Sequence, residues 1–189
     1  MSGILVKTYK DLPFNKKEIL RYAGCREADE AVSALLETCL EEIKGKLTYR
    51  VCYGVFPLTV EGEFCDLGVA RFRSKALAKN LADCREAVVF AATVGVGMDR
   101  LIARYSSLSP AKALMLQAIG AERVEALCDA FCAEMGGKKP RFSPGYGDLP
   151  LETQKELARI LDCGKRIGVT LNESLLMSPS KSVTALMGR

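Results

Sequence analysis

Apolar residues recur at helical spacing in several stretches of the chain. Residues 27–43 place Val32, Leu36 and Leu40 on one face, which predicts an amphipathic helix that Gly45 ends. Other helices are expected after polar residues that can cap a first turn, such as Asn and Ser. These shorter helices are expected over residues 16–22 after Asn15, 75–82 after Ser74, 98–106, and 151–166.

The longest predicted helix begins at Ser109-Pro110 and continues to Met135. A serine hydroxyl can accept a hydrogen bond from a free N–H of the first turn, and proline fits where no N–H is needed. Gly136-Gly137 then ends the helix.

Other stretches favour strands. Residues 47–58 and 63–69 are rich in Tyr, Val, Thr and Phe, and Glu61-Gly62 between them is typical of a turn, so the two stretches predict an antiparallel hairpin. Further strands are expected at residues 87–93, 169–171 and 182–187. The mixture predicts an α+β fold in a single domain, 1–189, with helices packed around an antiparallel sheet and a helical N-terminal segment over 1–46.

The composition excludes several kinds of catalytic site and partner. The 189 residues include no histidine, which excludes catalytic triads with a histidine base and histidine-ligated zinc sites. The net charge of +4 comes without a basic run, so no nucleic-acid partner is expected. The longest apolar stretch, residues 87–98, is shorter than the roughly 20 residues that span a bilayer, and the N-terminus does not resemble a signal peptide.

Eight cysteines are present, and none of them forms a Cys-x-x-Cys pair. Most stand among Ala, Leu and Val, where a free thiol behaves as a small hydrophobic group. We therefore expect buried thiols in a reducing compartment and a cytoplasmic protein.

Gly95-x-Gly97 between a predicted strand and a predicted helix is one candidate for nucleotide binding. The dinucleotide-binding motif needs a third glycine, and Arg100 stands in its place. A tight turn from strand to helix is the better interpretation.

Glu125 is a second candidate. On the long helix it is the one charged residue in a stripe of small and apolar side chains that share a face, at positions 114, 118, 121, 125, 128, 132 and 135. A buried carboxylate needs a cationic partner. The stripe is consistent with an internal ion pair or an exposed face, and equally with a receptor for a ligand ammonium or hydroxyl.

The third candidate is the decapeptide RFSPGYGDLP, residues 141–150. Four of its ten residues are glycine or proline, which restrict the backbone. Arg141 can bind a carboxylate or phosphate, Tyr146 offers a ring face, and Gly145 lets a ligand approach the main chain. A rigid connector with an ordinary surface arginine would have the same composition.

The decapeptide resembles a signature of the S-adenosylmethionine-binding activation, or reactivation, domain of cobalamin-dependent methionine synthase. That signature, Arg-x-x-Pro-Gly-Tyr-x-x-x-Pro, is matched by Arg141, Pro144, Gly145, Tyr146 and Pro150. Residues 93–99 are similar to the family's Thr-Ala-Gly-Leu-Gly-Ile-Asp segment. The resemblance is strongest over 88–188 and continues through Ile167-Gly168, Leu171, Glu173-Ser174, Met177, Pro179 and Ser182-Val183.

The resemblance implies a ligand site. S-adenosylmethionine would contact Arg141, Gly145 and Tyr146 of the loop, with Ser143 and Pro144 beside them, and Glu125 of the preceding helix. An aspartate near the family's N-terminus also contacts the ligand, and Gly24 stands at the corresponding position here.

The resemblance also implies a role. The domain would support reductive methylation of inactive cob(II)alamin on a partner methionine synthase in trans, with an electron donor such as flavodoxin, and so serve methionine biosynthesis. The cobalamin would belong to the partner. Alternatives are a reactivation partner of another corrinoid methyltransferase, and a non-catalytic subunit that completes a truncated methionine synthase. A small-molecule methyltransferase is disfavoured, because no glycine-rich nucleotide loop is present.

Overall fold

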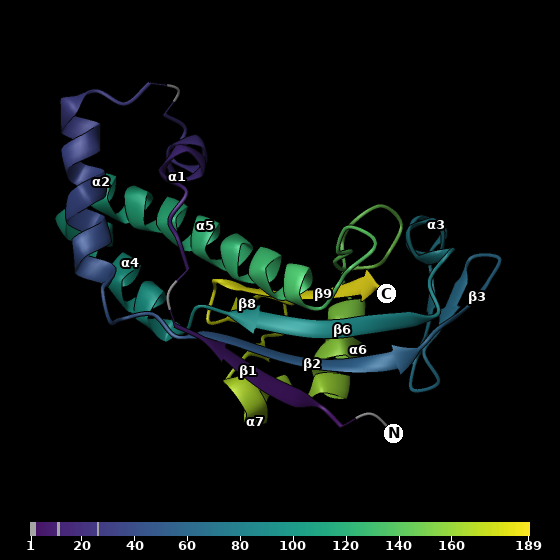
Figure 1. Cartoon of the computed structure of the whole chain (residues 1–189). Helices are drawn as coiled ribbons and strands as arrows, with labels where there is room; N and C mark the ends of the chain where they lie inside the picture. The colour runs from purple at the N-terminus through teal and green to yellow at the C-terminus, as the bar shows by residue number, and fades with distance from the viewer. Residues whose placement is uncertain (1–2, 11, 26) are drawn as a thin grey trace.

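A four-stranded antiparallel sheet forms the centre of the computed structural model, which describes residues 3–10, 12–25 and 27–189. Its strands lie in the order β1 (Leu5–Tyr9), β2 (Tyr49–Pro57), β6 (Glu86–Thr93) and β9 (Ser182–Gly188). Helix α5 (Pro110–Glu134) runs along one face, and α6 (Thr153–Leu161) and α7 (Cys163–Ile167) lie on the other (Figure 1). The sheet is therefore a middle layer that is covered on both sides.

The remaining elements surround this centre. Helices α2 (Glu30–Ile43) and α4 (Val96–Leu108) lie near the N-terminal half of α5, and α1 (Lys16–Tyr22) lies beside the middle of α5 (Figure 1). A second, three-stranded sheet stands beside α3 (Lys75–Leu81) and consists of β3 (Thr59–Glu61), β4 (Phe64–Asp66) and β5 (Arg71–Arg73). The last pair of strands is β7 (Thr170–Leu171) and β8 (Met177–Ser178).

Strand β6 explains why the sheet is central. It pairs with β2 on one side and β9 on the other, and its residues from Ala87 to Thr93 are at most 1% exposed. Alternate residues face opposite sides of a strand. Phe90 accordingly packs against Phe131 of α5, whereas Val89 belongs to the core on the α6 side. A strand buried on both faces needs apolar side chains on both, and residues 87–92 of β6 are all apolar, between Glu86 and Thr93 at its ends.

Most predicted helices are confirmed. Asn15 and Ser74 cap α1 and α3 through their side chains, and α5 begins at Pro110 as expected. Ser109 differs from the prediction, because its side chain makes no capping hydrogen bond. The predicted helix 151–166 is two helices, because Asp162 adopts a left-handed conformation, with φ of 50°, between α6 and α7.

The predicted hairpin is wrong. The turn after Glu61 exists, but it joins the short strands β3 and β4. Strand β2 pairs with β1 and β6, because its alternating buried residues belong to the central sheet. The segment 1–46 is not helical throughout, since it also contains β1. Within the described residues, no helix is long and apolar enough to cross a membrane, and all eight cysteines are free thiols.

The turn at Gly95-x-Gly97 is confirmed as a tight turn. Gly95 has a φ of 80° and precedes the first residue of α4. A Cβ atom built on Gly97 would overlap the carbonyl oxygen of Lys46, at the end of α2. The two glycines thus serve the backbone conformation and the close approach of two chain segments, which removes the reason to assign them to a nucleotide.

Candidate functional site

Backbone pairing fastens the loop 141–150 to the central sheet. The N–H of Phe142 donates to the carbonyl of Leu186 in β9 over 2.7 Å, and the N–H of Leu186 donates back over 2.8 Å. Within the loop, the N–H of Gly145 donates to the carbonyl of Leu149, and that of Tyr146 to the carbonyl of Ser143. These bonds give a loop without regular secondary structure a defined shape.

Asp148 holds the other side of the loop against α3. Its carboxylate accepts hydrogen bonds from the Ser74 hydroxyl over 2.5 Å, from the N–H of Lys75 over 2.8 Å and from the N–H of Ala76 over 3.1 Å. Free N–H groups at a helix start favour a negative charge. The hydrogen bond from Ser74, followed by those from Ala76 and Lys75, lowers the pKa of Asp148 from 3.8 to about 2.

This pKa predicts a pH-dependent contribution to stability. The folded state stabilises the charged form of the Asp148 carboxylate, and the unfolded state does not. This stabilisation is complete above pH 3.8, the ordinary pKa of the group, and is lost as the pH falls towards 2. We expect the free energy of unfolding of the wild type to fall more steeply than that of Asp148→Asn across this range. Urea unfolding at several pH values measures the difference. Parallel pH profiles for the two proteins would contradict the predicted role.

Two glycines shape the tip of the loop. Gly145 has a φ of 88° and Gly147 a φ of 55°, a region that side chains rarely adopt. A Cβ atom on Gly147 would lie 2.7 Å from the Cβ of Ala76, so the loop and α3 are in close contact there. Gly145 is exposed and a Cβ atom on it would meet only Leu151, at 3.4 Å. The main chain at Gly145 is therefore open to a ligand.

Arg141 joins the loop to α5 through two carboxylates. Its guanidinium donates hydrogen bonds to Glu125 and to Asp129, which lie one turn apart on the helix. The Arg141 side chain is 20% exposed, whereas those of Glu125 and Asp129 are 42% and 70% exposed. The arginine is thus mostly buried, and both carboxylates retain contact with solvent.

The electrostatics of this cluster fix the charge of Arg141. Burial lowers its pKa, but the hydrogen bond to Asp129 and the nearby negative charges outweigh burial and place the pKa above its usual value. Burial raises the pKa of the neighbouring Cys128 thiol, although the charge of Arg141 opposes the rise. Near neutral pH the Arg141 guanidinium is therefore charged and the Cys128 thiol is neutral.

Beyond the carboxylates lies a groove of about 370 Å³ between α5 and the N-terminal segment. Glu125 and Asp129 form part of its wall, together with Glu18 and Tyr22 of α1. Arg123, on the same helix, holds the N-terminal segment in place by donating to the carbonyls of Leu12 and Pro13. Oxygen acceptors at this groove can bind an ammonium or hydroxyl group.

The structure brings together most residues that the sequence singled out. Glu125 and Arg141 are in direct contact, so the ion pair expected as one interpretation of Glu125 is present. Ser143 is half-buried and Pro144 is buried in the same loop. Tyr146 is 60% exposed and packs edge-on against Phe142.

For two residues the structure differs from the site predicted from the sequence. Gly24 follows the end of α1, with a φ of 75°, and supplies no carboxylate to the groove. Asp129 was missed, because it lies outside the apolar stripe that drew attention to Glu125. Its spacing of four residues from Glu125 was the available signal, since such residues are neighbours on a helix.

Comparison with known proteins finds similarity to one domain family in part of the sequence and in the fold. Residues 136–189 match the family model described as "Vitamin B12 dependent methionine synthase, activation domain". A solved structure entitled "Crystal Structure of the MetH Reactivation Domain bound to AdoHcy" matches the whole fold with a TM-score of 0.71. The match covers 99% of this chain and 78% of that chain, at 16% sequence identity. The chain has the fold of the methionine synthase activation domain.

The two comparisons support this assignment over different extents. The family model for the activation domain includes the loop with Arg141, Pro144, Gly145 and Tyr146, and begins after Glu125. The structural match extends the activation-domain fold to the N-terminal helices. No curated protein matches the sequence. The expected resemblance is therefore confirmed in sequence for the C-terminal part and in fold for the whole chain.

Proposed function

We propose that the chain binds S-adenosylmethionine where the loop 141–150 meets α5. The observation that carries this proposal is the position of Arg141, a mostly buried cation held between the carboxylates of Glu125 and Asp129. A guanidinium has five N–H donors, so Arg141 can hold both carboxylates and bind an acceptor of the ligand as well. The proposed contacts are Glu125, Arg141, Ser143, Pro144, Gly145 and Tyr146.

The chemistry of these groups fits the ligand. Its ammonium and ribose hydroxyls are donors, and Glu125 and Asp129 present solvent-accessible oxygens to donors. Its carboxylate is an acceptor that suits a guanidinium. The exposed ring of Tyr146 suits a cation or an aromatic base, and the open main chain at Gly145 permits close approach. The similarity to a reactivation domain whose structure contains AdoHcy supports the same ligand class here.

The further part of the proposal is reactivation. The chain would act on a cobalamin-dependent methionine synthase in trans, where one electron from a donor such as flavodoxin and the methyl group of the sulfonium would be transferred to cob(II)alamin, leaving S-adenosylhomocysteine. The bound ligand supplies that methyl group. The chain's own residues bind and orient the ligand, which is the main source of acceleration when the reacting atoms belong to cofactors. No proton need be removed, in agreement with the absence of histidine.

Titration calorimetry tests the binding step. We expect wild-type protein to bind S-adenosylmethionine in the micromolar range, and Arg141→Ala to bind at least about tenfold more weakly, since charge-assisted hydrogen bonds contribute about 1.5–3 kcal/mol. Arg73→Ala is the matched control, because Arg73 is an exposed arginine that also pairs with a carboxylate, that of Glu63. Absence of binding by the wild type, or equal binding by Arg141→Ala, would refute the proposed site.

The reactivation step needs its own experiment. Cob(II)alamin on a methionine synthase that lacks its activation domain is mixed with reduced flavodoxin, S-adenosylmethionine and the chain, and methylcobalamin is followed by absorbance. We expect methylation with the wild type and a loss with Arg141→Ala. If the wild type binds S-adenosylmethionine but does not support methylation, the ligand proposal stands and the reactivation proposal fails.

A further inference from the structure

Strand β1 leaves one edge of the central sheet open. It is the end strand in the order β1-β2-β6-β9, and it pairs with β2 over Leu5–Tyr9. Within the part of the chain that the structure describes, no backbone group hydrogen-bonds to its outer edge from Leu5 to Tyr9. An open edge of this kind can pair with another strand. The opposite edge strand, β9, is the one that contacts the loop 141–150, so the open edge is far from the proposed ligand site in the order of strands.

Apolar side chains accompany this edge. Leu5 is 55% exposed and Val6 is 42% exposed. Because successive residues point to opposite faces of a sheet, the two side chains flank the open edge on both sides. An added strand would cover both of them.

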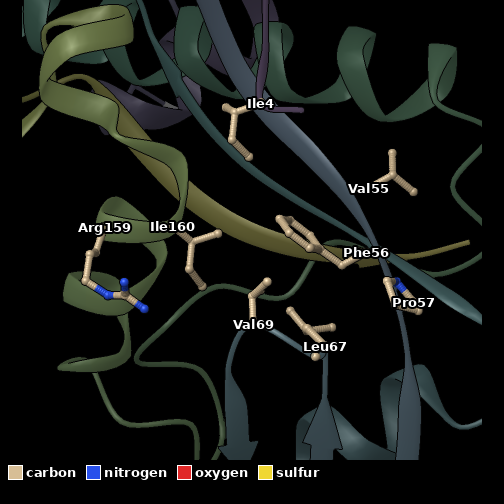
Figure 2. Close-up of a pocket in the computed structure, with 9 residues that line it drawn as sticks. Ile4, Val55, Phe56, Pro57, Leu67, Val69, Arg159 and Ile160 are labelled. Carbon is tan, nitrogen blue, oxygen red and sulfur yellow. The ribbon is translucent and has the colours of Figure 1, made fainter. Parts of the chain in front are cut away.

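A cavity of about 730 Å³ continues from the start of β1. Figure 2 shows Ile4 at one side of it, Phe56 and Pro57 from the end of β2, and Leu67 and Val69 from the loop after β4. Arg159 and Ile160 of α6 close the remaining side (Figure 2). The wall is therefore mostly apolar, with enough room for a large side chain of a bound segment.

Cations lie beside the same edge. Arg50 is opposite Thr8 of β1, and it donates to the carbonyl of Arg166 over 2.7 Å. Arg166 in turn donates to the carbonyl of Ile4 over 3.0 Å. Both guanidiniums thus bind carbonyl groups, and among the described residues neither has a carboxylate within ion-pairing distance. Lys165, next to Arg166, is exposed. On the α5 side of this edge Lys7 of β1 pairs with Glu134, so the cations without a carboxylate partner lie on the α7 side.

From this combination we propose that the β1 edge, defined as Ile4–Lys10 with the adjoining cavity, binds an extended acidic segment of a partner protein. The segment would pair with β1 as a fifth strand, place an apolar side chain in the cavity and present carboxylates to Arg50, Lys165 and Arg166. Main-chain pairing gives affinity to such interactions, and pockets for alternate side chains give specificity. A second copy of the chain fits less well, because pairing two β1 edges would bring the same cations together.

Fluorescence anisotropy tests the proposal with a labelled octapeptide of four valines followed by four glutamates, which presents both residue types to each face of the sheet. We expect saturable binding, about tenfold weaker for Lys165→Glu, which removes an attraction and adds a repulsion. Val69→Glu, at an exposed position of the cavity wall, should weaken binding similarly. The matched control is Lys79→Glu on α3, an exposed lysine that lies away from β1.

Two further peptides separate the causes of binding. A version that is N-methylated at every residue has no N–H group left to donate to a strand edge and should not bind, and a version with lysine in place of glutamate should bind more weakly. Equal binding of the N-methylated peptide, absence of binding at millimolar concentration, or an unchanged affinity of Lys165→Glu would each overturn the proposal. Dimerisation through β1 in place of peptide binding would overturn it as well. Calorimetry with S-adenosylmethionine is unaffected by these outcomes, so the proposed ligand site is tested separately.

Discussion

Replacing Arg123 by methionine is expected to destabilise the fold by about 3–5 kcal/mol, the range found when one partner of a buried ion pair is removed. The Arg123 side chain is 0% exposed, and its guanidinium donates to the carboxylate of Glu122, which is 4% exposed, over 2.6 Å. It also donates to the carbonyls of Leu12 and Pro13 over 2.7 and 2.6 Å. Methionine fills much of the volume but leaves one buried charge and two carbonyls without these donors.

Urea unfolding measures this effect as a lower midpoint at an unchanged slope. Arg159→Met is the surface control, because Arg159 pairs with Glu156 on the outside of α6, and we expect it to change stability by less than about 1 kcal/mol. The double variant Glu122→Gln with Arg123→Met should lose less than the sum of the single losses, because it leaves no unpaired charge. A wild-type midpoint for Arg123→Met would show that the N-terminal segment does not depend on this contact.

Gly97→Ala is expected to cost about 3 kcal/mol, the upper part of the range for inserting atoms into a packed site. A Cβ atom at this position would overlap the carbonyl oxygen of Lys46 and lie 3.0 Å from its carbonyl carbon. These are main-chain atoms, so the clash is relieved only by moving α4 away from the end of α2. A flexible side chain would have yielded at much lower cost.

The matched control is Gly164→Ala in α7. A Cβ atom there would have its nearest neighbours at 3.8 and 3.9 Å, which is ordinary contact. We expect this variant to be as stable as the wild type or up to about 1 kcal/mol more stable, because alanine favours helices over glycine. Thermal unfolding of both variants tests the prediction. If the two glycines behave alike, the close approach at Gly97 does not limit the fold.

Local signals in the sequence predicted the helices well. Asn15 and Ser74 cap their helices through hydrogen bonds that lie within three residues, so the information is local. The apolar run of residues 87–93 likewise predicted the strand that is observed as β6. The failures involve choices that short segments leave open. The β2 sequence is compatible with a hairpin partner, and its pairing with β1 and β6 depends on residues about 30 to 50 positions away.

The candidate site shows the same division. The periodicity of α5 identified Glu125 as a candidate, and the composition of the loop identified Arg141. The two residues are only sixteen positions apart in the sequence and are in contact. Asp129 escaped because it lies outside the apolar stripe, and only its spacing of four residues from Glu125 pointed to it. The role of Asp148 could not be predicted from sequence either, since its partner α3 begins more than seventy residues earlier. Such a contact becomes visible only when the loop and helix are placed in space.

The position of β9 has a consequence for synthesis of the chain. β6 is flanked by β2 and β9, and β9 spans Ser182–Gly188. Until those residues leave the ribosome, the largely apolar strand β6 has an unpaired edge, and the loop that carries Arg141 lacks its anchor at Leu186. The nascent polypeptide therefore completes its folding only after residue 188 emerges, and a premature stop before β9 yields a product that is prone to aggregation and degradation.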